Sequence, residues 1–101
     1  MNSRLKFPAH AQERRFERGF TRDDIRHVLS TGEVINKYPT DRPFPSYLVL
    51  RWIEKEEDRQ PVHLVAADDD ERDVTFVITV YEPDSDLWTD DFRRRTNNGA
   101  N

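Results

Sequence analysis

The stretch Val74-Thr-Phe-Val-Ile-Thr-Val-Tyr81 is an unbroken run of β-branched and aromatic residues in a chain of 101 residues. Such residues favour extended backbone, and an apolar run without regular polar alternation is typical of a strand that is covered on both faces. We therefore expect residues 74–81 to form a strand at the centre of a sheet. Pro83 ends it, because proline cannot donate to the ladder.

Three more strands are expected upstream, over residues 33–38, 47–54 (YLVLRWIE) and 61–67. The loop 39–45 contains three prolines and separates the first two. Charged turns over residues 55–60 and 68–73 separate the others. Consecutive strands joined by short turns favour an antiparallel meander.

The N-terminal part has helical character instead. Residues 9–18 (AHAQERRFER) contain strong helix formers, and Gly19 follows where a C-terminal cap belongs. Thr21 and Asp24 resemble a capping box that opens a second helix through Ser30. Trp88 and Phe92 stand four residues apart, which predicts a short C-terminal helix that docks both rings on the sheet.

These elements predict an α+β fold: two N-terminal helices, a four-stranded antiparallel sheet and a short C-terminal helix. Residues 1–8 are expected to be a lead-in, residues 9–92 a single domain, and residues 93–101 a basic, disordered tail.

Composition limits the chemistry. The chain has no cysteine, which excludes disulfides, a thiol nucleophile and thiolate metal ligands. No apolar stretch reaches the length of a membrane span or a signal-peptide core, so we expect a cytoplasmic protein without a membrane partner.

Charge is unevenly distributed. Residues 1–27 hold seven Lys/Arg and four Asp/Glu, whereas residues 61–92 hold one Arg and ten Asp/Glu. Three consecutive arginines, Arg93, Arg94 and Arg95, follow this acidic segment. A chain with a basic front and an acidic back meets a polyanion with one face only, although both regions also suit ordinary solvated surfaces.

His10, Arg14 and Arg18 lie four residues apart and so fall along one face of the first helix. Two guanidiniums beside an imidazole suit contact with a phosphate, because arginine donates bidentately and imidazole moves a proton near neutral pH. Alternatively, both arginines form ion pairs with Glu13, Glu17 or the acidic strands, and His10 caps the helix or packs.

His63 is a second candidate. It alternates with Val62 and Leu64 in a strand, so its side chain lies on the other face of the sheet from theirs. If that face turns toward the first helix, His63 can complete an acid–base pair with His10 or approach Arg14. A packing role is the alternative.

Tyr81 and Glu82 end the strand before Pro83, a position where functional residues collect and where a phenol can donate to a phosphate oxygen. Metal and cofactor sites are not expected: the histidines at 10, 27 and 63 lack ligand spacing, and no phosphate-binding glycine loop occurs. Interleaved aromatic and basic residues, the pattern that stacks single-stranded bases, occur only loosely at Arg51-Trp52.

Three segments together resemble a small bacterial and archaeal family of uncharacterised domains. Residues 10–21 (HAQERRFERGFT) are similar to its HAxxRxxxRGI(S/T) opening, residues 32–39 (GEVINKYP) to its middle, and residues 77–83 (VITVYEP) with Trp88 to its end. The resemblance implies an order of elements similar to that of RelE- and BrnT-type toxins, which are small ribonucleases neutralised by an antitoxin. His10, Arg14 and Arg18 would then line the active face, with His63 and Tyr81 nearby.

Two hypotheses follow. In the first, the chain is a toxin-like, metal-independent endoribonuclease that meets RNA through its N-terminal basic face and pairs with an antitoxin-like protein. In the second, it is a non-catalytic protein-binding module that uses a sheet edge or a helix face. A structural or dimer-forming role is also compatible with the sequence.

Overall fold

A short strand precedes the helices. The computed structural model describes residues 4–96, and its first element is β1 (Arg4–Lys6), which runs parallel to β5 (Val74–Tyr81). Leu5 aligns with Thr75 and is buried in the core. The lead-in expected over residues 1–8 is therefore wrong for residues 4–6. Three residues with one apolar side chain carry too little pattern to reveal a strand that a distant neighbour holds in place.

Both expected helices are present. α1 (Ala9–Glu17) is followed by Gly19, whose φ of +74° forms the corner before α2 (Arg22–Thr31). The capping box is confirmed: the Thr21 hydroxyl accepts from the Asp24 amide, and the Asp24 carboxylate accepts from the Thr21 amide. Arg18 and Thr21 thus end one helix and begin the next within a few residues.

The remaining strands form the expected meander. β2 (Glu33–Tyr38), β3 (Ser46–Lys55), β4 (Asp58–Asp69) and β5 pair antiparallel in sequence, and the sheet order is β1-β5-β4-β3-β2. The sheet is therefore five-stranded and mixed, and the expected four-stranded antiparallel sheet is wrong. β4 rather than β5 is its central strand, because β1 adds a neighbour on the far side of β5.

The hairpins β3–β4 and β4–β5 close with tight turns, so β3 and β4 extend beyond the ends expected from the sequence. Glu56 and Asp73 adopt positive φ values of 56° and 55°, which close the chain within a few residues. The charged segment 55–60 is accordingly mostly strand, although its composition is typical of a turn. Solvent-exposed charges at a hairpin tip are compatible with pairing because the backbone alone makes the ladder.

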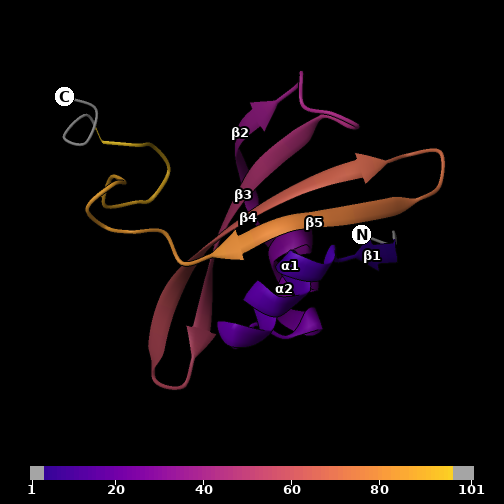
Figure 1. The fold of residues 1–101 in the computed structure, drawn as a ribbon. Coiled ribbons are helices and arrows are strands. Elements are labelled where there is room, and N and C mark those ends of the chain that lie inside the picture. Colours follow the sequence, from indigo (N-terminus) through magenta and orange to yellow (C-terminus); the bar gives the residue numbers. More distant parts are fainter. Residues whose placement is uncertain (1–3, 97–101) are drawn as a thin grey trace.

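The helices cover one face of the sheet (Figure 1). Phe20, Ile25 and Val28 pack there against strand residues that alternate with outward-facing neighbours. The main core consists of Leu5, Phe20, Ile25, Val28, Val49, Ile53, Val62, Leu64, Ala66, Val77 and Val80.

The C-terminal segment packs against the opposite face without forming a helix. The Phe92 ring lies edge-on to Trp52 of β3, with 5.5 Å between centroids, and the Trp88 ring lies 4.4 Å from that of His63 of β4. Turns and an isolated bridge between Trp88 and Arg95 shape this segment. Both rings therefore dock on the sheet as expected, but the helix is wrong. The segment contains a run of Asp and Thr residues that favour turns.

The order strand–helix–helix–meander also differs from the RelE-like order that the resemblance implies. Of the expected tail 93–101, residues 93–96 are described: Arg93 forms an ion pair with Glu33 of β2 at 2.7 Å. Residues 97–101 lie outside the described part of the chain.

We expect Leu5→Ala to lower the free energy of unfolding by about 2–5 kcal/mol, because the buried side chain leaves a cavity under β1. Urea denaturation followed by circular dichroism measures this change. Arg4→Ala is the matched control, since Arg4 is exposed on the same strand. Equal stability of the two variants would show that β1 does not dock as described.

Candidate functional site

His63 lies on the sheet face opposite the helices. Its neighbours along β4, Val62 and Leu64, belong to the helix-side core, whereas His63 is fully buried beneath the C-terminal segment. Nε2 lies 2.9 Å from the Phe92 carbonyl oxygen and Nδ1 lies 3.3 Å from the Tyr81 hydroxyl. The condition for an acid–base pair with His10 or Arg14 is therefore not met, because His63 faces away from α1.

These contacts define the hydrogen-bonding state of the ring. A carbonyl oxygen only accepts, so Nε2 carries the proton and donates to Phe92, and Nδ1 then accepts from the Tyr81 hydroxyl. Burial lowers the pKa of His63, although the hydrogen bond to Phe92 partly opposes this. Burial raises the pKa of Tyr81, because it also favours the neutral form of the phenol. The pair thus connects β4, β5 and the C-terminal segment as neutral groups.

Phe92 holds its carbonyl toward His63 with a φ of 59°. A bulky residue in the left-handed region is an uncommon conformation that surrounding contacts must maintain. Its ring against Trp52 and its carbonyl on His63 supply those contacts. The C-terminal segment is therefore attached at a specific point.

We expect the free energy of unfolding to fall as pH is lowered below about 6.5, because unfolded His63 binds a proton near that pH while the folded form, with its lowered pKa, does not. Denaturation at pH 7.5 and 5.5 measures the loss. His63→Gln should weaken this pH dependence, whereas His10→Gln, at an exposed position, should retain it. An unchanged dependence in His63→Gln would contradict the assignment.

The predicted trio on α1 is spread along the helix. His10, Arg14 and Arg18 are all exposed, and the eight residue steps from His10 to Arg18 correspond to about 12 Å of helix axis. Arg18 reaches β5, where its guanidinium donates to the Val80 carbonyl oxygen at 2.6 Å. Since β1 pairs only as far as Phe76, that carbonyl lies on a part of β5 beyond the β1 ladder. His10 is therefore too distant to share a single phosphate with Arg18.

A hollow of about 250 Å³ lies beside Arg18, where β5 ends. Phe20, Gln60, Tyr81 and Glu82 form the rest of its lining. Glu82 is exposed and accepts from the Gln60 amide at 3.3 Å. The Tyr81 hydroxyl bonds His63 instead. Two of the predicted residues, Arg18 and Tyr81, thus meet at one hollow, and Glu82 supplies its carboxylate.

A second hollow, of about 490 Å³, shares Phe20 with the lining of the first. Its lining comprises Arg15, Phe16, Gly19, Phe20, Thr21, Arg22 and Asp23. We call the two hollows together the corner groove, because they flank the turn between α1 and α2. Lys55 of β3 adds a lysine to these arginines: it donates to the Gly19 carbonyl and lies 5.3 Å from the Phe20 ring centroid.

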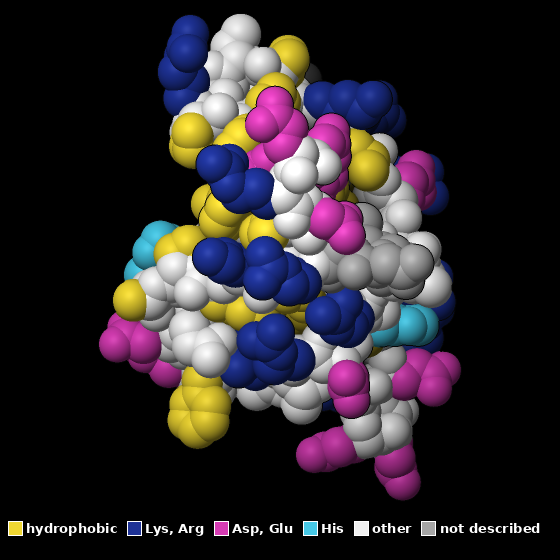
Figure 2. All heavy atoms as spheres, turned by 90° about the vertical axis from the view of Figure 1, so that its right-hand side faces the viewer, with side chains coloured by type: hydrophobic (Ala, Val, Ile, Leu, Met, Phe, Trp, Pro, Cys, Tyr) yellow, Lys and Arg dark blue, Asp and Glu magenta, His cyan; other side chains and the backbone are white. Residues whose placement is uncertain are grey.

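Cations also gather on one side of the molecule. Figure 2 looks onto the side of the molecule where β1 lies and shows Lys and Arg side chains clustered across its middle. Exposed cations of β1 and the helices include Arg4, Lys6, Arg14, Arg18 and Arg22. Although the chain is acidic overall, this side is therefore rich in cations, and we call it the basic face.

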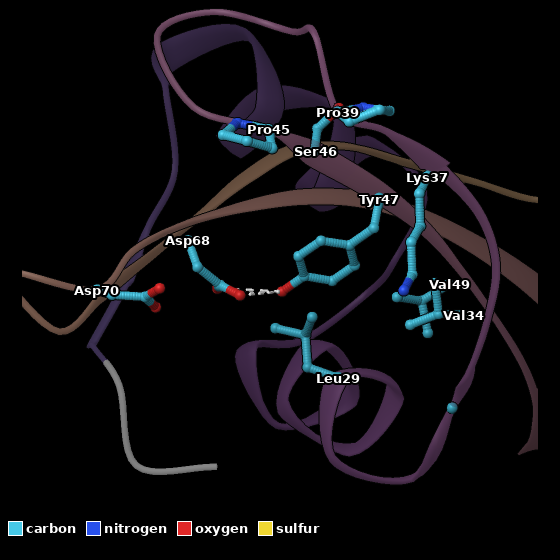
Figure 3. A pocket seen from close by; sticks show the side chains of 11 residues that line it. Leu29, Val34, Lys37, Pro39, Pro45, Ser46, Tyr47, Val49, Asp68 and Asp70 are labelled. Atoms are coloured by element: carbon cyan, nitrogen blue, oxygen red, sulfur yellow. Dashed lines mark hydrogen bonds between the residues drawn. The ribbon is translucent and has the colours of Figure 1, made fainter.

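A further pocket lies elsewhere, between α2 and the β2–β3 edge (Figure 3). It measures about 510 Å³ and has mainly apolar walls, including Leu29, Val34 and Val49. Tyr47 donates to both carboxylate oxygens of Asp68 at 3.0 Å. Burial, and then this carboxylate, raises the pKa of Tyr47. Lys37 and Asp70 also line this β2 pocket, so it combines apolar walls with a few charged groups.

A protein-family model, described as a domain of unknown function (DUF4258), matches residues 7–82. The chain belongs to this family. The matched region includes α1, α2, the meander and Glu82, and therefore the whole corner groove. Neither a curated protein nor a solved structure matches the chain.

Within residues 4–96, neither helix of this family member is long and apolar enough to cross a membrane. The same residues contain no group of three or more His, Asp or Glu side chains that could hold a metal ion.

Sequence reasoning missed Gln60 and the hollow beside Phe16. Gln60 sits in a segment whose charges indicate a turn, and only the β4–β5 pairing, which sets His63 opposite Tyr81, brings it to Glu82. The predicted aromatic–basic pair Arg51-Trp52 is of little use for stacking, because the Trp52 ring is half-buried between Phe92 and Arg59. The sequence did offer a signal for the exposed ring: Phe16 stands among charged residues in residues 13–18 (ERRFER).

Proposed function

We propose that this member of the family is a metal-independent endoribonuclease of the toxin type, with its active site at the β5 end of the corner groove. The observation that carries the proposal is the convergence of Arg18, Gln60 and Glu82 in one hollow where the exposed Arg18 and Glu82 side chains meet solvent. A carboxylate beside a guanidinium is a minimal set for moving a proton and stabilising charge on a phosphate.

In the proposed reaction, the RNA 2′-hydroxyl gives its proton to the Glu82 carboxylate and its oxygen bonds to the adjacent phosphorus. The bond from phosphorus to the 5′-oxygen breaks, and that oxygen takes the proton back from Glu82. The products are a 2′,3′-cyclic phosphate and a 5′-hydroxyl, so no other reactant is needed.

Arg18 suits the role of charge stabiliser. One guanidinium N–H donates to Val80, which fixes the side chain, and the other N–H groups are available for phosphate oxygens. His10 and Arg14 lie farther up α1, where they suit contacts with neighbouring phosphates of the same strand. The pairing with an antitoxin-like protein is part of this proposal and follows from the resemblance of the sequence motifs.

We expect Glu82→Gln to lower the rate of RNA cleavage by about 10²- to 10⁴-fold, because the general base is lost. Arg18→Ala should lower it by about 10²- to 10³-fold, by analogy with the loss of one charge-stabilising donor. The measurement uses a fluorescein-labelled single-stranded RNA in EDTA, with products resolved on a gel and tested for a cyclic phosphate end.

Glu71→Gln is the matched control, since Glu71 is exposed at the β4–β5 turn, away from the corner groove. It should cleave at the wild-type rate. No cleavage by the wild-type protein, or equal rates in Glu82→Gln and wild type, would contradict the assignment.

A non-catalytic protein-binding module is the second candidate, and the β2 pocket favours it. β2 is an edge strand, Val34 on it is 45% exposed, and the pocket lies alongside. An added strand gains main-chain hydrogen bonds at such an edge and places a side chain into the adjoining pocket. Asp68 and Asp70 favour a basic segment.

A peptide titration tests this candidate. The acetylated, amidated hexapeptide Lys-Val-Lys-Leu-Lys-Val should shift the amide resonances of β2 and the pocket, while the version with Glu in place of Lys should not. Val34→Glu should remove the effect, because it places a carboxylate at the pocket wall. Shifts spread over the whole acidic surface, or none at β2, would exclude this mode.

A further inference from the structure

Phe16 is the most exposed large apolar side chain of the described residues. It is 79% exposed, whereas Phe20, one turn later, is 2% exposed and packs in the core. An exposed single apolar residue is not unusual by itself. Here, however, the ring borders a hollow that Arg15 and Arg22 also line, so its surroundings suggest a use.

Two guanidiniums line that hollow with Phe16. Arg15 is fixed in place, because it donates to the Phe20 carbonyl oxygen at 2.7 Å and to the Gln12 side chain at 3.0 Å. Arg15 and Arg22 also lie over the Phe7 ring, with 5.3 and 5.1 Å from guanidinium carbon to centroid. The cations therefore have defined positions beside an accessible aromatic face.

The lining of this hollow shares Phe20 with the lining of the proposed active site. Phe20 lines both hollows, so Phe16 and Arg15 lie at one end of the corner groove and Arg18 with Glu82 at the other. Asp23 also lines the second hollow, beside Phe16, and adds one negative charge. An aromatic face next to fixed cations is the combination that binds single strands without sequence preference.

We propose that Phe16 is a stacking platform for an unpaired base of single-stranded RNA, with Arg15 and Arg22 binding the flanking phosphates. This inference rests on the proposed function, because it names the substrate class of the same groove. It goes beyond that function in making single-strandedness the requirement: a base held in a duplex has no free face to offer the ring.

Fluorescence anisotropy tests the platform in the Glu82→Gln background, which separates binding from cleavage. The probes are a fluorescein-labelled 12-nucleotide oligouridine and an abasic oligomer of the same length and charge. Phe16→Ala should weaken oligouridine binding by about 5- to 150-fold. It should leave abasic binding and the salt dependence unchanged, because no phosphate contact is lost.

Two further variants make the result specific. Phe16→Trp should bind oligouridine at least as tightly as the parent, since it keeps a stacking face. Arg14→Ala should weaken both probes by the same factor, since it acts on phosphates. Phe16 and Arg14 are both exposed, so we expect these substitutions to leave the fold intact, and circular dichroism checks this.

Equal affinity of Phe16→Ala and its parent for oligouridine would overturn the platform while leaving the basic face intact. A parallel loss for both probes would also overturn it. If the parent binds neither probe, the proposed function fails along with it. Self-association of the parent that Phe16→Ala abolishes, without an effect on RNA, would assign the ring to a protein contact instead.

Discussion

The central strand β4 is covered on both faces, and the rest of the molecule is arranged around this double burial. Val62, Leu64 and Ala66 face the helices, whereas His63 faces the C-terminal segment and is equally buried. Because side chains alternate strictly along a strand, the choice of face for one residue sets it for all the others. The helix layer and the C-terminal layer are thereby assigned to opposite sides of one sheet.

A second constraint is that β1 is much shorter than β5, the strand with which it pairs in parallel. β1 pairs with the first three residues of β5, so the later carbonyls of β5 need other donors. Arg18 meets this need at Val80 and, in doing so, holds the end of α1 against the end of β5. Beside the corner groove, a side chain rather than a strand thus completes the backbone hydrogen bonding of β5 at Val80.

The charged residues are unevenly distributed over the molecule. The chain is acidic overall, with a formal net charge of -4, yet its basic residues are concentrated on β1 and the two helices. Local cation density, rather than net charge, governs contact with a phosphate backbone at short range, because charges beyond a Debye length are screened. The β2 pocket, beside Asp68 and Asp70, has the opposite polarity and suits a different kind of partner.

The sequence by itself determined the local elements: both helices, the capping box at Thr21, the limits of β2 and β5, and the meander. These depend on neighbours within a few residues. Only the tertiary structure decided which face His63 occupies, that residues 4–6 form a strand, and that Gln60 meets Glu82. Each of these depends on a pairing across tens of residues, and sequence periodicity carries no information on which side of a sheet its helices will pack.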